Sequence, residues 1–173
     1  MSDRSGGIQL LIRRAFKFEL KPNGMQIQLM KQFCGCARYV YNRTLSLERS
    51  LYKKDNKHSF KYAEAANRLP EWKKKNPFLK ECHSQVLQQS LEDLDQAYTN
   101  FFRKQANFPR YKKKFQHDSI RFPQGVELDE VKQQIRVPKI GWMGYRKSRD
   151  IIGTIKNVTV SRRGEKWDVS IQT

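Results

Sequence analysis

Cysteine and histidine side chains that could bind a metal ion occur in two close pairs. Cys34 and Cys36 form one pair, and Cys82 and His83 form the other. A structural zinc site needs four such ligands at one point, usually with at least two residues between paired cysteines. The spacing here departs from that pattern, and nothing in the sequence brings the pairs together. We therefore expect no metal site and cysteines that pack as small apolar residues.

Carboxylates, the ligands of catalytic Mg²⁺, are clustered locally in residues 92–95 and 127–130. A metal-dependent nuclease needs acids that converge from several elements. Pairing with nearby Lys or Arg explains local clusters better, so we expect no catalytic residue in this chain. An enzyme with a Mg²⁺ site built from Glu92, Asp95 and Glu127 stays open as an alternative. The three histidines suggest no catalytic triad: His58, His83 and His117.

The balance of charge is the most informative property of the composition. The 173 residues contain 35 Lys and Arg against 17 Asp and Glu, which gives a net charge of +18. A folded domain with this excess repels itself, and a polyanionic partner compensates for it. Nucleic acid is the partner we favour over an anionic membrane surface or a role in solubility, because aromatic residues are interleaved with the cations. The apolar run 8–12 is too short to span a membrane.

Basic and aromatic residues are concentrated in the segment 103–115. Cations there can neutralise phosphates, and Phe108, Tyr111 and Phe115 can stack on bases. A solvated basic loop with buried aromatics is the alternative. The residues expected to contact a nucleic-acid backbone or to stack on it are Arg103, Lys104, Arg110, Tyr111, Lys112, Lys113, Lys114, Arg121, Arg146, Lys147 and Arg149.

Hydrophobic periodicity predicts which elements carry these residues. Residues 14–21 alternate as in a half-buried strand. Helical spacing follows in residues 25–33 and 37–52, with Gly35 between them, which predicts a helix-turn-helix arrangement. A short helix is expected over residues 59–69 with Ser59 as N-cap, then a turn over 70–77. An apolar stripe predicts a long helix over residues 84–104.

The C-terminal third has the two-residue period of strands. Alternating pairs occur at Ile120, Val126 and Ile135, and a hairpin is expected around the turn 162–164. The lone first strand needs partners, and only these strands can supply them. The fold expected is therefore α+β: a small β-barrel with a helical recognition domain, resembling a helix-turn-helix bundle, inserted after its first strand. Its parts would be residues 1–21 (a flexible start and the first barrel strand), 22–115 (the helical domain) and 116–173 (the remaining barrel).

Several segments, in this order, resemble the transposon-encoded TnpB (OrfB) family of RNA-guided DNA endonucleases. They extend over nearly all the chain, from the opening strand to the last hairpin. No single segment is decisive, whereas the ordered set is specific. The segments are 16–22 (FKFELKP), 35–42 (GCARYVYN), 87–98 (LQQSLEDLDQAY), 100–103 (NFFR), 108–114 (FPRYKKK), 121–125 (RFPQG), 137–142 (VPKIGW) and 157–161 (NVTVS).

The resemblance implies that the chain binds a guide RNA from the transposon end and reads a short adjacent motif in target double-stranded DNA. The remaining specificity would come from RNA–DNA pairing. Glutamine can pair bidentately with adenine in the major groove, although ordinary exposed helix residues are the alternative. Carried over to matching positions, the motif-reading residues would be Ser84, Gln85, Gln88, Gln124 and, on a poorer match, Phe60.

The family's RuvC-like nuclease domain follows the last hairpin, and this sequence stops at Thr173, before that domain would begin. We therefore expect binding without cleavage and no cofactor in this chain, the family's Mg²⁺ belonging to the nuclease half. A separate nuclease half or a full-length homologue would be a further partner. With three cysteines and no signal peptide, the expected location is a bacterial or archaeal cytoplasm, at the nucleoid. A stand-alone helix-turn-helix regulator of transposition is the alternative function.

Overall fold

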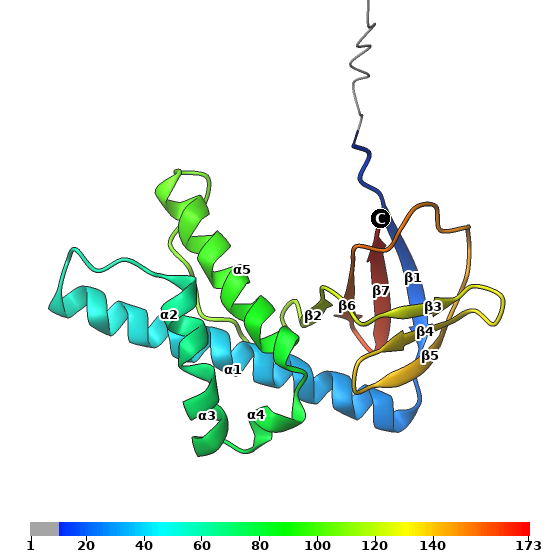
Figure 1. The fold of residues 1–173 in the computed structure, drawn as a ribbon, viewed down its shortest axis with the longest axis horizontal. Coiled ribbons are helices and arrows are strands. Elements are labelled where there is room, and N and C mark those ends of the chain that lie inside the picture. The colour runs from blue at the N-terminus through cyan, green and yellow to red at the C-terminus, as the bar shows by residue number, and fades with distance from the viewer. Residues whose placement is uncertain (1–10) are drawn as a thin grey trace, which may run out of the picture.

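A computed structural model describes residues 11–173 as a helical layer joined to a seven-stranded antiparallel sheet (Figure 1). All the helices lie between the first and second strands in the sequence, as expected. The predicted flexible start, residues 1–7, lies outside the described residues. The elements are β1 (Ala15–Lys21), α1 (Gly24–Lys54), α2 (Tyr62–Asn67), α3 (Leu69–Lys75), α4 (Phe78–Glu81), α5 (Ser84–Phe102), β2 (Ser119–Phe122), β3 (Glu127–Asp129), β4 (Gln134–Val137), β5 (Gly141–Tyr145), β6 (Asn157–Arg163) and β7 (Lys166–Gln172).

The first helix is continuous through Gly35, so the turn predicted there is wrong. α1 has 31 residues and begins with a capping box, in which Asn23 and Gln26 exchange hydrogen bonds of 2.8 and 3.0 Å. A glycine inside a helix costs only about 1 kcal/mol relative to alanine. Phe33, Cys36 and other buried residues on both sides of Gly35 share one core, and this packing outweighs that cost.

The segment after α1 differs from the sequence expectation in its boundaries. Ser59 does not cap a helix, because the chain is extended there while Phe60 stacks on Tyr98 at 5.4 Å. The predicted turn over residues 70–77 is largely helix α3, since Pro70 is tolerated in a first turn and Trp72 is buried in the core. α5 confirms the predicted long helix. It ends at Phe102, and Lys104 follows in a left-handed conformation with φ of 59°.

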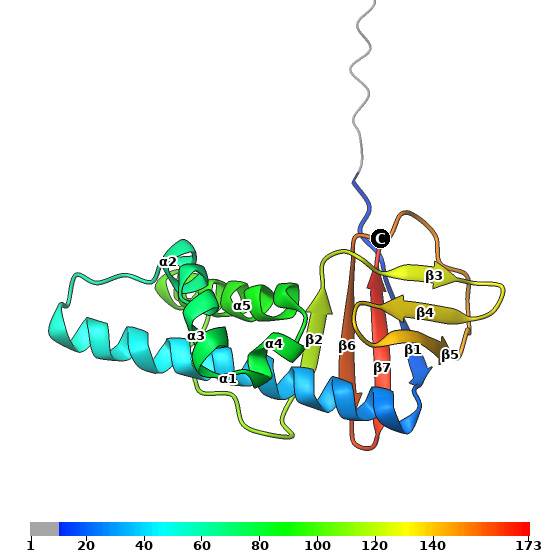
Figure 2. The ribbon, with the colours of Figure 1, turned by 60° about the horizontal axis from the view of Figure 1, so that its bottom comes forward.

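The strands form an open, twisted sheet rather than the predicted barrel. Their order is β2-β6-β7-β1-β5-β4-β3, so β2 and β3 are the two edges and do not pair with each other. β1 connects the halves by pairing with β7 along residues 15–19 and with β5 at Leu20 and Lys21. The helices lie mainly beside the sheet and contact it chiefly at the edge strand β2, and the helices and the sheet share one core (Figure 2). The β6–β7 hairpin is confirmed, whereas β5 was missed because two glycines break its alternation.

Side-chain hydrogen bonds to backbone carbonyls fix the helices to the sheet at two points. The Gln26 amide donates from the first turn of α1 to the Trp142 carbonyl at 2.8 Å and, more weakly, to Ile140 at 3.4 Å. Lys139 Nζ, from the loop before β5, donates to the carbonyls of Lys80 and Cys82 at 3.1 and 3.3 Å. The first turn of α1 and the segment that leads into α5 are therefore each hydrogen-bonded to the β4–β5 part of the sheet.

Candidate nucleic-acid interface

The linker that follows α5, residues 103–118, runs antiparallel along α1. The Arg49 guanidinium lies over the rings of Phe108 and Tyr111, at 5.1 and 5.0 Å from their centroids. Nearer the start of α1, Asn42 holds the backbone of Lys112 by two hydrogen bonds, of 2.8 and 2.9 Å. At the far end of the linker, Arg38 pairs with Asp118 at 3.1 Å. The basic tract is therefore fixed in place along the helix.

This arrangement joins linker cations to α1 cations that the sequence argument missed. Arg110, Lys113 and Lys114 are exposed on the linker. On α1, Arg43 stacks over Trp72 at 4.9 Å, and with Arg38 it lines an open hollow of about 510 Å³. We call the cationic residues of this surface the α1–linker face: Arg38, Arg43, Arg49, Arg110, Lys113 and Lys114.

Lys112, which is predicted as a phosphate contact, makes contacts within the protein although 44% of its side chain is exposed. Its ammonium lies 4.3 Å from the Tyr41 ring centroid and 3.8 Å from an Asp93 carboxylate oxygen. Burial lowers the pKa of Lys112, while Asp93 acts in the opposite direction. With its backbone held by Asn42 as well, Lys112 anchors the linker. The exposed cations on either side remain the candidates for phosphate binding.

The end of the linker carries backbone strain and an exposed ring. Phe115 and His117 both have left-handed conformations, with φ of 64° and 52°. Each such residue costs about 1–2 kcal/mol. The Phe115 side chain is 67% exposed, with the cationic groups of Lys114 and Arg162 at 4.9 and 5.3 Å from its centroid. Strained residues concentrate at binding sites, and an exposed aromatic ring between two cations suits a nucleic-acid base.

The remaining predicted contacts lie in two places. Arg121 lines a small crevice with Lys112 and Asp93, next to the linker. The group on the β5–β6 loop is separate, at the end of the sheet where β1 begins (Figure 1). There Lys147 is paired with Glu130 and Asp150 at 3.1 and 2.7 Å. The other cations are exposed, with Arg149 over the Phe16 ring at 5.5 Å and the Arg146 backbone amide bound to the Glu19 carbonyl.

The start of α5 places four of the predicted motif-reading residues near one another. The His83 ring lies 6.1 Å from Phe122 at the end of β2, which brings Gln124 towards the first turn of α5. Gln88 and Gln124 are exposed. Ser84 Oγ accepts a hydrogen bond of 2.8 Å from Lys73. Gln85 is half-buried, and its Oε1 has no partner among residues 11–173.

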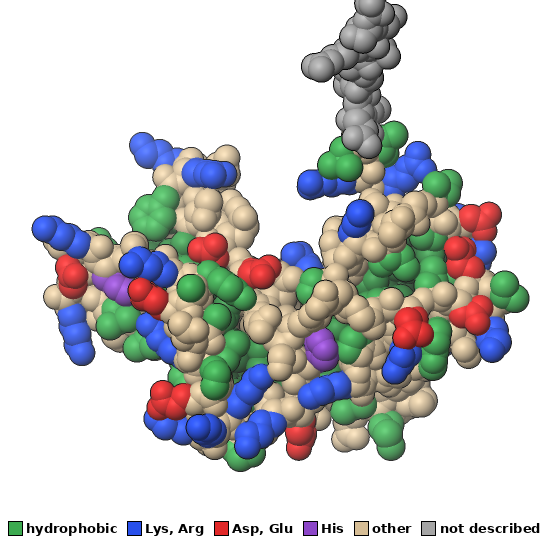
Figure 3. Space-filling model, viewed as in Figure 1, with side chains coloured by type: hydrophobic (Ala, Val, Ile, Leu, Met, Phe, Trp, Pro, Cys, Tyr) green, Lys and Arg blue, Asp and Glu red, His purple; other side chains and the backbone are tan. Residues whose placement is uncertain are grey.

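Cations surround this end of α5, as Figure 3 shows along the lower edge of the view, over α3 and α4. Burial lowers the pKa of His83, and the charges of Lys139 and Lys73 act in the same direction. A neutral His83 beside two ammonium groups leaves the site positive, as contact with a phosphate backbone requires. Phe60, by contrast, lies elsewhere, stacked on Tyr98 at 5.4 Å. Tyr98 is ten residues beyond Gln88, about 15 Å along the helix.

The cysteines that could have bound a metal ion pack in the core instead, and the acidic Glu127 forms an ion pair. Among residues 11–173, no three Cys, His, Asp or Glu side chains come together as metal ligands, so the Mg²⁺ site from Glu92, Asp95 and Glu127 is not formed. Glu127 pairs instead with Arg136 across the β3–β4 hairpin. All three cysteines are buried free thiols in the shared core. Burial raises the pKa of Cys34 to about 12, so this thiol stays protonated.

The sequence of the chain matches a known protein family and two known proteins. Residues 12–57 match the family HTH_OrfB_IS605, which is described as a helix-turn-helix domain. In the present structure that stretch consists of β1 and the uninterrupted α1. The chain is thus a nucleic-acid-binding module of a transposon protein. No helix within residues 11–173 has the length and apolar character needed to cross a membrane.

Two longer proteins are similar to this chain. "Putative RNA-guided DNA endonuclease InsQ" of Escherichia coli (strain K12) is 49% identical over 162 residues, which cover 92% of the chain and 40% of InsQ. "Putative RNA-guided DNA endonuclease" of Streptomyces pristinaespiralis is 39% identical over 104 residues, covering 58% of the chain and 25% of that protein. The chain belongs to the TnpB (OrfB) family. It spans about two fifths of the length of InsQ.

Proposed function

We propose that the chain binds a guide RNA along the α1–linker face and holds target DNA at the start of α5. The observation that carries the proposal is the linker fixed along α1, which presents cations from two distant segments on one surface. Phosphates bind to such cations with release of counterions. The names of the two relatives, both described as RNA-guided DNA endonucleases, support RNA and DNA as the partners.

In this proposal the DNA motif is read at the start of α5. Gln88 and Gln124 are exposed there, and a glutamine amide can pair with both groups of an adenine edge. The cations of Lys73 and Lys139 at the same place would contact the DNA backbone. Base pairing between guide and target would supply the remaining specificity. In this proposal the chain binds nucleic acid without cutting it.

The test is RNA binding by the whole chain as a function of salt. In the test variant, Arg110, Lys113 and Lys114 are each replaced by glutamine. The matched control replaces three exposed lysines outside the face, Lys54, Lys57 and Lys132, so that both variants lose the same charge. Each phosphate contact to a single strand contributes about 0.7 to the slope of log K against log salt. Loss of three contacts should therefore make the slope shallower by about 2 units, and the control should keep the wild-type slope.

Equal slopes for the test and control variants would show that only net charge matters, and that the α1–linker face is not the contact surface. Tighter binding to duplex DNA than to RNA, in the absence of any RNA, would support the stand-alone regulator in place of a guide-RNA module. Sequencing the RNA that copurifies with the protein would identify the guide directly.

A further inference from the structure

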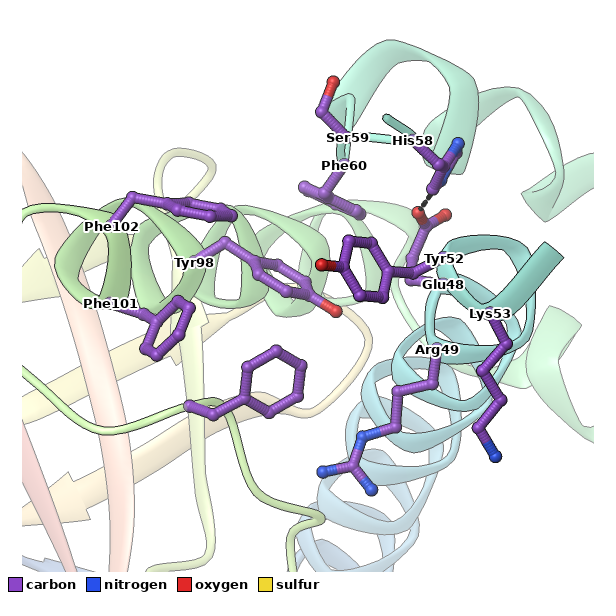
Figure 4. Close-up of a pocket in the computed structure, with 11 residues that line it drawn as sticks. Glu48, Arg49, Tyr52, Lys53, His58, Ser59, Phe60, Tyr98, Phe101 and Phe102 are labelled. Atoms are coloured by element: carbon purple, nitrogen blue, oxygen red, sulfur yellow. Dashed lines mark hydrogen bonds and ion pairs between the residues drawn. The ribbon is translucent and has the colours of Figure 1, made fainter. Parts of the chain in front are cut away.

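A cavity of about 430 Å³ lies between the C-terminal ends of α1 and α5, next to the α1–linker face, with which it shares Arg49 (Figure 4). The turn of chain after α1, which carries His58 and Phe60, covers one side of it, and Phe108 of the linker also lines it. Its size falls within the range of small-molecule binding pockets. The sequence could not reveal it, because its walls come from two stretches far apart in the chain, residues 48–60 and 98–108.

The walls of the cavity are aromatic rings. The Tyr98 ring is nearly parallel to those of Phe60 and Phe102, with centroids at 5.4 and 6.5 Å and interplanar angles of 20°. Phe108 meets Tyr98 edge-on at 5.7 Å. At the mouth, Phe102 is 69% exposed and Tyr52 is 57% exposed. The fold gains little from rings left so open to water, whereas flat aromatic surfaces suit a planar ligand.

The charges around the cavity favour an anionic ligand. Its carboxylate, Glu48, is buried, forms an ion pair with Arg68 at 2.9 Å and lies 2.5 Å from the His58 Nε2 atom. The cations Arg49 and Lys53 also line the cavity, and within residues 11–173 neither forms an ion pair with an acid. Arg49 is held in position by its contacts with Phe108 and Tyr111. A ligand with a flat apolar part and flanking negative charges would satisfy both features.

We propose that this cavity takes one unstacked base of a bound single-stranded RNA, with the phosphates on either side of that base held by Arg49 and Lys53. The proposal rests on the proposed function, since it assumes that the chain binds RNA. Stacking of single-stranded bases on aromatic side chains next to cations is a common mode of binding. An apolar side chain from a protein partner would pack against the rings but would leave the positive charges of Arg49 and Lys53 without a negative partner.

Tyr98 supplies a polar group to the proposed site. Its hydroxyl points into the space between α1 and α5 (Figure 4). Burial, together with the negative charge of Glu48, raises the pKa of Tyr98 to about 12. The hydroxyl is therefore protonated at neutral pH and can donate a hydrogen bond to a ring nitrogen or carbonyl of the base. Phe60 then has a role in holding RNA, which differs from the motif reading that the sequence suggested.

The experiment compares two short RNA-like strands of about ten nucleotides: an oligoadenylate, and an abasic strand with the same ribose-phosphate backbone. The variants Phe102→Ala and Tyr52→Ala remove exposed rings at the mouth and should fold normally. Trp142→Ala, which removes a partly exposed ring from the sheet, is the control. Circular dichroism melting curves check folding for all three.

We expect Phe102→Ala and Tyr52→Ala to weaken oligoadenylate binding roughly 5- to 100-fold, the usual range for one stacked base. Affinity for the abasic strand should be unchanged, as should the salt slope, because no phosphate contact is lost. Trp142→Ala should bind both strands as wild type does.

Wild-type affinity of both mouth variants for oligoadenylate would overturn the cavity proposal and leave the proposed function standing. An equal loss of affinity for both strands would overturn it as well, since the base would then make no difference. Failure of the wild-type chain to bind either strand at low salt would instead remove the proposed function, and the cavity proposal with it.

Discussion

Replacing Gln26 by leucine is expected to destabilise the fold by removing one of the two hydrogen-bonded connections between helices and sheet. The side chain is buried, with 9% of the residue exposed. Its amide nitrogen donates to Trp142 at 2.8 Å and its oxygen accepts from the Asn23 backbone amide at 3.0 Å. Leucine fits the space but leaves a carbonyl and an N-terminal N–H of α1 without these partners.

The magnitude follows from those two groups. An unsatisfied buried backbone group costs about 1–3 kcal/mol, and loss of the Gln26 half of the capping box, one hydrogen bond, costs about 0.5–1.5 kcal/mol, while Asn23 still caps the helix. The two together predict a fall of about 1.5–4.5 kcal/mol in the free energy of unfolding, against a total of about 5–15 kcal/mol for a typical domain. Urea unfolding followed by tryptophan fluorescence measures this fall, and the m-value should not change.

Gln28→Leu is the matched control, because Gln28 lies two residues further along α1 and is exposed. Its effect should stay within about 0.5 kcal/mol. A Gln26→Leu variant that is no less stable than Gln28→Leu would refute the reasoning, since the contacts to Trp142 and Asn23 would then contribute nothing to the connection.

Two further predictions concern the linker and the sheet. Asn42→Ala removes both hydrogen bonds to the Lys112 backbone, so trypsin should cleave within residues 110–114 faster than in wild type, and an unchanged cleavage rate would mean that other contacts hold the linker. A hydrogen bond from Arg163, at 2.9 Å, holds the pKa of the buried Asp168 carboxyl below its usual value of about 3.9. Its contribution to stability is therefore complete above the unfolded-state pKa and is lost as pH falls through the lower folded-state value. Asp168→Asn should therefore lose less stability than wild type between neutral and acid pH, as measured by urea unfolding. A loss as large as that of wild type would mean that other groups cause the fall in stability at low pH.

Local patterns in the sequence were enough to predict α5 and the β6–β7 hairpin, because both depend on residues close together in the chain. The prediction of a turn at Gly35 also rested on residues close together in the chain, and it was wrong for that reason. Helix propensity is a local quantity, whereas α1 continues through Gly35 because its neighbours are buried against the rest of the core. The barrel was wrong because strand periodicity shows which residues are buried but not whether the edge strands β2 and β3 pair with each other.

The candidate site was predicted only in part. The basic tract is evident in the sequence, but its place along α1 depends on Asn42, which lies 70 residues from Lys112. For the same reason the sequence could not show that Lys112 also anchors the linker, and its contact with phosphate stays a prediction. The cations at the start of α5 were also missed as a group, since Lys73 and Lys139 reach it from a different helix and from the sheet.

The continuity of α1 has a consequence for how the proposed contacts would be spaced. Its 31 residues extend about 46 Å. The first turn is fixed to the sheet through Gln26, the middle holds the linker through Asn42, and the last turns line the aromatic cavity through Glu48. A hinge at Gly35 would let these parts move independently. A single helix instead fixes the distance between the sheet-bound first turn and the cavity, so an RNA bound as proposed, at the cavity and along the linker, would have one register relative to the sheet.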